Sequence, residues 1–174
     1  MVLNSPRPPG FHIRGISLSE CLCALTLTGI VAAHSLPTLE QLAQRARVDA
    51  VRDRWIGDLD LARSWSLRQG QESQLSRRTG CALLSDDKDW RCGWQVRAMV
   101  DGQVLADTPL AGEVSVVFSS PQGELRVSSR GDPLSGGASL RIKPWQMQWA
   151  MLASTLCLNI TGRIRIQAGE GCGA

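Results

Sequence analysis

The stretch GISLSECLCALTLTGIVAAHSLP, residues 15–37, decides how this chain of 174 residues is organised. From Ile16 to Leu36 the residues are mostly apolar, with Glu20 the only acidic residue and neither Lys nor Arg. A helix of about 21 residues spans roughly 30 Å, which is the thickness of the hydrocarbon core of a bilayer. We therefore expect a transmembrane helix over residues 16–37.

The basic residues around this segment are distributed unevenly. Arg7 and Arg14 precede it, whereas the first basic residue after it is Arg45. Positive charge on the leading side keeps that end of a membrane helix in the cytoplasm. The sequence therefore predicts a single membrane pass with a cytoplasmic N-terminus, and an outward-facing remainder.

Glu20 is the unusual residue of the apolar segment. A carboxylate near the start of a membrane helix costs about 2–3 kcal/mol, so it indicates a function. If the chain is cut between Gly15 and Ile16, Glu20 becomes the fifth mature residue, and the new N-terminal amine of a neighbouring subunit can neutralise it. The alternative is an ordinary secretory signal cut near Ala33, which leaves Glu20 without a role.

Residues 15–20, Gly-Ile-Ser-Leu-Ser-Glu, resemble the prepilin peptidase site of type IV pilins and type II secretion pseudopilins. The resemblance implies that prepilin peptidase removes residues 1–15, that Ile16 is N-methylated, and that Glu20 acts in assembly with other pilins or pseudopilins. It also implies anchoring in the bacterial inner membrane.

Two further residues bear on this resemblance. Pro37 falls where pilins commonly carry a helix-kinking proline, whereas Ile16 stands where Phe is usual. The nearby pair Gly10-Phe11 is an alternative site, but it places Gly15 rather than a carboxylate at the fifth position.

Residues 38–70 follow a helical pattern. Gly70 is a suitable C-terminal stop, so we expect one helix from Ile16 to Gln69 whose second half is amphipathic and packs on a domain. Apolar residues at spacings of three and four form one face of that half: Val48, Val51, Trp55, Leu59, Ala62 and Trp65.

The sequence predicts a β-rich domain over residues 71–174. This domain is periplasmic if the chain is a pilin. Val114, Val116 and Phe118 alternate with less apolar residues, and Gly- or Pro-containing turns separate the candidate segments. The expected fold is α+β and pilin-like, with the long helix packed on an antiparallel sheet or sandwich. The candidate strands are Ser73–Leu84, Gly93–Val100, Gln103–Ala106, Glu113–Ser119, Glu124–Ser129, Ala138–Ile142, Thr155–Asn159 and Arg163–Gln167.

Four cysteines lie in this predicted domain. Proximity in sequence favours the disulfides Cys81–Cys92 and Cys157–Cys172, and disulfides indicate an oxidising compartment such as the periplasm. A zinc site built from all four thiolates is the alternative, although the close cysteine pair usual in such sites is absent.

The predicted domain also resembles the FimT/GspH family of minor pilins and pseudopilins. The motifs that carry this resemblance are Asp89-Trp90 with Cys92-Gly93-Trp94-Gln95-Val96, Leu61-Ala62-Arg63-Ser64 with Arg68-Gln69-Gly70, and Leu156-Cys157-Leu158-Asn159 with Thr161-Gly162-Arg163-Ile164-Arg165.

Gly162-Arg163-Ile164-Arg165 matches the Gly-Arg-x-Arg motif with which the FimT branch binds DNA during natural transformation. Residues i and i+2 of a strand point to the same face, so two guanidiniums about 7 Å apart can follow the phosphates of one DNA strand. Arg141 and Lys143 are candidates to widen the patch. Residues 126–174 hold six basic and two acidic residues, which adds to the positive charge there.

Enzymatic chemistry is not expected. His12 lies in the predicted leader and His34 in the predicted membrane segment, so the domain lacks histidine-dependent triads. No cofactor, metal or small-molecule substrate is predicted; the acidic residues 86, 87 and 89 lack a complete calcium-loop spacing. Trp145 and Trp149 could belong to the core or to an exposed stacking platform, and the core is favoured.

Two functions remain. The first is a minor type IV pilin, incorporated in or priming the pilus, that binds DNA non-specifically; the Gly-Arg-x-Arg motif favours it. The second is a minor pseudopilin of a type II secretion system.

Overall fold

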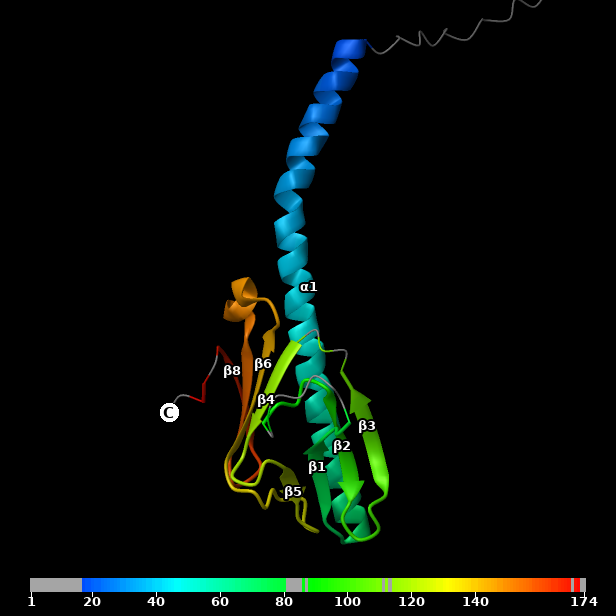
Figure 1. Ribbon diagram of the computed structural model, residues 1–174, viewed down its shortest axis with the longest axis vertical. Coiled ribbons are helices and arrows are strands. Elements are labelled where there is room, and N and C mark those ends of the chain that lie inside the picture. Colours follow the sequence, from blue (N-terminus) through cyan, green and yellow to red (C-terminus); the bar gives the residue numbers. More distant parts are fainter. Residues whose placement is uncertain are drawn as a thin grey trace, which may run out of the picture. The chain divides into compact units, whose positions relative to one another are not determined.

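The computed structural model describes residues 17–80, 86, 88–110, 112, 114–169 and 171–172. The chain divides into two compact units, Met1–Leu39 and Glu40–Ala174. Helix α1, Leu18–Gln69, contributes residues to both units, and Figure 1 labels it together with most of the strands that follow. The predicted processing residues Gly15 and Ile16 lie outside the described residues.

In the first unit, α1 begins with a reciprocal pair of hydrogen bonds. The backbone N–H of Ser17 donates to the Glu20 carboxylate (2.9 Å), and the N–H of Glu20 donates to the Ser17 hydroxyl (3.2 Å). This capping box satisfies two donors that a helix start leaves unpaired, which explains why α1 begins at Leu18. Among the residues that the structure describes, no helix combines the length and the apolar character that crossing a membrane requires.

In the second unit, one face of α1 packs into the core of the domain. Val48, Trp55, Leu59 and Ala62 are almost fully buried, at the spacings that the sequence predicts. Two antiparallel four-stranded sheets supply the rest of this core. The predicted α+β fold is therefore confirmed.

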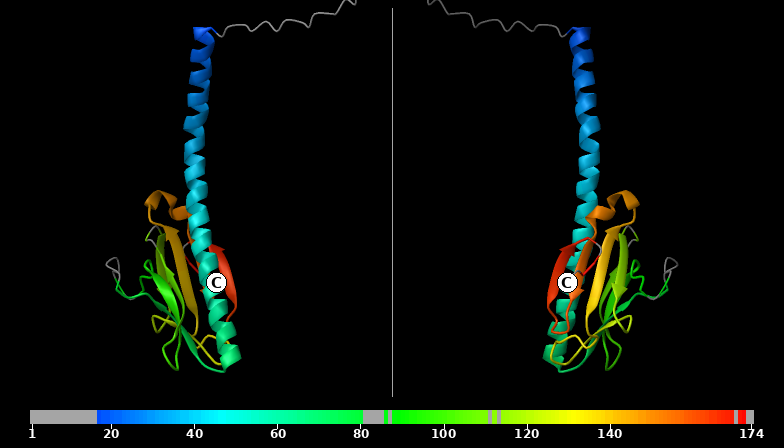
Figure 2. Two further views of the ribbon diagram at one scale, coloured as in Figure 1. Left: turned by 90° about the vertical axis from the view of Figure 1, so that its right-hand side faces the viewer. Right: turned by 90° about the vertical axis from the view of Figure 1, so that its left-hand side faces the viewer.

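The first sheet has the strand order β3-β2-β1-β5, and the second has the order β4-β6-β7-β8. Figure 2 shows the sheets of the domain in two side views. The bounds in the first sheet are β1 Ser73–Arg77, β2 Gly93–Ala98, β3 Val104–Pro109 and β5 Leu125–Val127. Those in the second are β4 Val114–Ser119, β6 Ala138–Pro144, β7 Ser154–Leu158 and β8 Ile164–Ala168, with a 3-10 helix η1, Met147–Leu152, between β6 and β7.

A buried carboxylate joins α1 to the first sheet. Asp58 of α1 accepts hydrogen bonds from the indole N–H of Trp94 (2.8 Å) and from the hydroxyl of Thr108 (2.6 Å). Because all three residues are buried, the carboxylate keeps two polar donors satisfied inside the core.

Gly93 lets β2 approach β3 closely beside this network. Its φ is 95°, and a Cβ atom there would lie 1.9 Å from the carbonyl oxygen of Thr108. A side chain at this position is therefore excluded both by the backbone conformation and by the contact.

The second sheet has an inner face in the core and an outer face. Along β6, every second residue from Ala138 to Pro144 is buried, while Ser139, Arg141 and Lys143 between them are half-buried. Leu156 and Leu158 of β7 are buried as well. The alternation fixes which side chains the sheet presents outward, including those of its edge strand β8.

Cys157 and Cys172 form a disulfide with a Cα–Cα distance of 5.8 Å. Two of the four thiolates are thus used, which rules out a zinc site made from all four. Cys92 is also disulfide-bonded, and Cys81, the partner that the sequence predicts for it, lies outside the described residues.

Candidate functional site

The predicted arginine motif lies in the hairpin that joins β7 to β8. The side-chain oxygen of Asn159 organises this turn by accepting hydrogen bonds from the N–H of Thr161 (3.1 Å), the hydroxyl of Thr161 (2.9 Å) and the N–H of Arg163 (2.8 Å). The backbone N–H of Asn159 in turn donates to the carbonyl of Arg163 (3.1 Å). The turn therefore fixes the backbone of Arg163 directly.

Gly162 is constrained by its backbone conformation and by its close neighbours. Its φ is 81°, and a Cβ atom there would lie 3.0 Å from a guanidinium nitrogen of Arg63 and 3.1 Å from the ring of Pro133. The same guanidinium donates to the carbonyl of Gly162 (2.6 Å). Glycine is thus required because the turn needs a left-handed residue and because α1 approaches the turn closely.

Arg163 and Arg165 are brought together. Both side chains are exposed, and both line one shallow hollow of about 290 Å³ together with Cys157, Asn159 and Gln167. Neither guanidinium forms an ion pair with any residue that the structure describes. Their positive charge is therefore available to an external anion.

The disulfide lies beside these arginines. Cys157 is the cross-strand partner of Arg165, so the side chains of these two residues leave the same face of the sheet. The bridge from Cys157 to Cys172 ties the C-terminal segment to this face. The hairpin is thereby attached both to α1, through Arg63, and to the end of the chain.

Arg141 and Lys143 share the outer face but lie two strands away from β8. Arg141 is in register with Thr155 of β7, and Thr155 is in register with Gln167 of β8. Two inter-strand spacings amount to about 10 Å. Both basic residues are half-buried and already have an interaction partner, so they are less accessible than Arg163 and Arg165.

Sequence reasoning missed two features of the site region. The first is the role of Asn159, for which the signal is an Asn three residues before a Gly, a spacing typical of turns. The second is the exposure of the segment after β6, where Trp145 is 58% exposed and Met147 is 93% exposed. The expectation that the core holds Trp145 is therefore wrong, whereas Trp149 of the same stretch is half-buried.

A family model described as type II transport protein GspH matches residues 50–162. The chain belongs to the GspH family. The matched range covers most of the domain and ends at Gly162, so Arg163 and Arg165 lie just beyond it. The FimT/GspH resemblance seen in the sequence is thereby confirmed, and it makes the chain a minor pilin or pseudopilin.

The fold is similar to that of a solved minor pilin. The type IV minor pilin FimU of Pseudomonas aeruginosa has 17% sequence identity and a TM-score of 0.50, with 77% of this chain and 96% of that chain covered. The minor pseudopilin EpsH of the Vibrio cholerae type 2 secretion system has 15% identity and a TM-score of 0.46, with 72% and 96% covered. No curated protein matches the chain.

Proposed function

We propose that this GspH-family protein is a minor type IV pilin that binds DNA without sequence preference, through Arg163 and Arg165, during natural transformation. The single observation that carries the proposal is a pair of exposed guanidiniums on one side of an edge strand, neither of which has an ion pair with a described residue. Guanidiniums bind phosphate oxygens in a planar, bidentate geometry. Such contacts read the backbone and not the bases.

The hairpin suits this task because it holds the two arginines before any ligand arrives. The turn formed by Asn159 fixes the backbone of Arg163, and the register with β7 fixes that of Arg165. Rigid presentation lowers the entropy that is lost on binding. Arg141 and Lys143, two strands away on the same face, are secondary candidates for contact with an elongated ligand.

A gel shift tests the proposal with residues 40–174, which form a compact unit. Arg163→Ala combined with Arg165→Ala is expected to abolish the shift. Each single substitution, Arg163→Ala or Arg165→Ala, should weaken binding and reduce the dependence of log K on log salt by about 1 for duplex DNA. The melting temperature should stay nearly unchanged, because both side chains are exposed.

The matched control is Arg45→Ala combined with Arg97→Ala, which removes the same charge from two other exposed positions. This variant is expected to keep most of the DNA affinity. Equal binding by the wild type and the Arg163/Arg165 variant would overturn the proposal. Equal losses in both double variants would mean that net charge alone drives binding.

We further propose that prepilin peptidase cuts the chain between Gly15 and Ile16, that Ile16 is methylated, and that the helix after it anchors the protein in the inner membrane with the domain in the periplasm. Glu20 would then meet the terminal amine of a neighbouring pilin. Mass spectrometry of the mature N-terminus tests this: a methylated Ile16 start is expected, and a start near His34 would exclude it.

A second candidate function is that of a minor pseudopilin in protein secretion. The observation that favours it is the family description, type II transport protein GspH, over residues 50–162. A deletion strain distinguishes the two. Loss of transformation with normal secretion supports the pilin function, whereas loss of secretion with normal transformation supports the pseudopilin function.

A further inference from the structure

Three exposed apolar side chains follow one another between strands β6 and β7. Trp145 comes directly after β6, and Met147 and Met151 belong to η1, none of whose residues is buried. Met151 is 73% exposed. Residues 144–162 contain no Asp, Glu, Lys or Arg, so this segment carries no charge that must stay hydrated. An exposed apolar surface of this kind marks a site of interaction.

The indole of Trp145 is supported by an ion pair. The guanidinium of Arg91 lies 4.8 Å from the centre of the indole ring, which is a cation–π contact. Arg91 in turn donates a hydrogen bond of 2.7 Å to the buried carboxylate of Asp89, and this bond is the main reason why the pKa of Arg91 is raised. Arg91 therefore orients the indole, while Asp89 compensates its charge.

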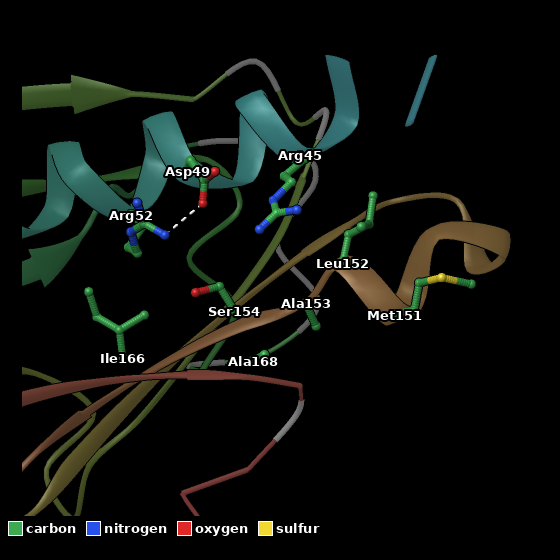
Figure 3. Close-up of a pocket in the computed structure, with 9 residues that line it drawn as sticks. All are labelled: Arg45, Asp49, Arg52, Met151, Leu152, Ala153, Ser154, Ile166 and Ala168. Atoms are coloured by element: carbon green, nitrogen blue, oxygen red, sulfur yellow. Dashed lines mark hydrogen bonds and ion pairs between the residues drawn. The ribbon is translucent and has the colours of Figure 1, made fainter. Parts of the chain in front are cut away.

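Arg45 of α1 adds a positive charge beside η1. It lines a groove of about 250 Å³ together with Met151 and Leu152, and Figure 3 shows it on α1 next to η1. Arg45 is exposed and forms no ion pair with any residue that the structure describes. The carboxylate of the groove, Asp49, binds Arg52 at 2.6 Å. The guanidinium of Arg45 is therefore left to an external anion.

The sequence position of Arg45 favours a lipid phosphate as that anion. Arg45 lies eight residues after Pro37, the predicted end of the membrane segment, and eight residues of helix rise about 12 Å. The headgroup layer extends about 5–7 Å beyond the hydrocarbon core, and a long arginine side chain covers the remaining distance. Glu40 precedes Arg45 by five residues, which turn a helix by about 140°, so the two side chains leave different sides of α1.

The arginine hairpin and η1 lie at opposite ends of β7. Helix η1 precedes Ser154, the first residue of the strand, and the hairpin follows Leu158, its last residue. Five residues of strand span about 17 Å. A ligand at η1 would therefore leave Arg163 and Arg165 accessible to DNA.

We propose that the domain docks on the surface of an anionic bilayer, with Trp145, Met147 and Met151 inserted at the lipid interface and Arg45 bound to a lipid phosphate. Trp is enriched at the boundary between the bilayer and water, and anionic lipids attract basic side chains close to the membrane. Apolar insertion and electrostatic attraction act together in binding of this kind. The inference rests on the proposed function, because the bilayer is the one that holds the membrane helix.

Fluorescence quenching in the full-length protein tests the docking. The protein is reconstituted into vesicles of phosphatidylethanolamine and phosphatidylglycerol whose acyl chains carry bromine, which quenches tryptophan on contact. Bromine should quench the wild type more than Trp145→Phe, because only the wild type places this indole among the lipids. Flotation of the same vesicles separates two failures. Protein that floats but shows equal quenching in both forms would overturn the docking alone, whereas protein that does not float lacks the anchor, and both proposals fail.

Further variants test the apolar and ionic contacts separately. Co-sedimentation measures the affinity of residues 40–174, a compact unit, for unbrominated vesicles of the same lipids. Met147→Ser and Arg45→Glu should each weaken binding by about tenfold. With vesicles of neutral phosphatidylcholine, only Met147→Ser should weaken it, because Arg45 then meets no anionic lipid.

The matched controls are Met99→Ser and Arg97→Glu, at exposed positions outside this surface. Both should bind the vesicles as the wild type does, and melting temperatures distinguish lost contacts from lost folding. Equal losses in the controls would overturn the proposal. A gel shift completes the test: Met147→Ser should keep its affinity for DNA, and a loss there would make the surface a DNA contact instead of a membrane contact.

Discussion

Two groups of polar residues in the domain differ in their burial and in their interaction partners. The Asp58 carboxylate is buried and accepts hydrogen bonds from Trp94 and Thr108. Arg163 and Arg165, by contrast, are exposed and have no ion pair with a described residue. In the first case polar groups satisfy one another and hold the fold together. In the second the backbone is fixed while the charged ends remain free for a ligand.

Stability and binding therefore depend on different side chains in this molecule. A buried polar group left without its partner costs more free energy than a hydrogen bond contributes. An exposed arginine that lacks a partner costs almost nothing, because water solvates it. Substitution of Asp58 should therefore change stability alone. Substitution of Arg163 or Arg165 should change binding alone.

Asp58→Ala is expected to have the largest effect on stability. The variant leaves the indole N–H of Trp94 and the hydroxyl of Thr108 buried without an acceptor, which should lower the free energy of unfolding by about 4 kcal/mol. Urea unfolding of residues 40–174 measures this loss. A gel shift without denaturant should show that the folded fraction still binds DNA.

Asp53→Ala is the control for that experiment. Its side chain is 65% exposed and pairs with Arg52, so its loss should cost less than about 1 kcal/mol. If both variants unfolded at the same urea concentration, the buried network would contribute no more to stability than a surface ion pair.

Much of the fold could be predicted because it depends on local patterns. The face formed by Val48, Trp55, Leu59 and Ala62 follows from helical spacing alone and is buried as expected. Strand β8 was displaced by one residue from the expected Arg163–Gln167, which is the usual uncertainty at an element boundary.

The parts that could not be predicted depend on tertiary contacts between distant residues. Arg63 meets Gly162 across 99 positions of sequence, and Asp58 meets Thr108 across 50. The local periodicity of apolar residues in the sequence does not predict such pairs. The exposure of Met147 and Met151 could not be predicted either, because hydropathy favours burial and does not tell which apolar residues stay at the surface.

Loss of the Cys157–Cys172 disulfide, which lies on the same sheet face as Arg165, is expected to have the second largest effect on stability. Cys157→Ser combined with Cys172→Ser opens a loop with a sequence separation of 15, and the less constrained unfolded chain should reduce the free energy of unfolding by about 3 kcal/mol. DNA affinity should change little, because Asn159 and not the bridge fixes the backbone of Arg163.

Reducing agent provides the control for this variant. With every disulfide reduced, the wild type and the variant should unfold at the same urea concentration. A large loss of DNA affinity in the folded variant would mean that the bridge positions the arginines, and the turn would then not be sufficient for binding.

Gly162→Ala should have the smallest effect on stability of the three, yet it acts on both properties because it lies where the fold meets the site. A left-handed alanine costs about 1 kcal/mol, and its Cβ atom must also displace Arg63 or Pro133, which lie within 3.1 Å. Gly169→Ala is the matched control, since its φ is 95° and nothing lies within 4 Å of the added atom.

Urea unfolding measures the stability of both variants. The free energy of unfolding should fall by about 2 kcal/mol for Gly162→Ala and by about half that for Gly169→Ala. The gel shift should weaken only for Gly162→Ala, because only that change moves the turn that carries Arg163. Identical binding by the two variants would show that the arginines tolerate a displaced turn, and that presentation by a rigid hairpin is not what makes them a binding site.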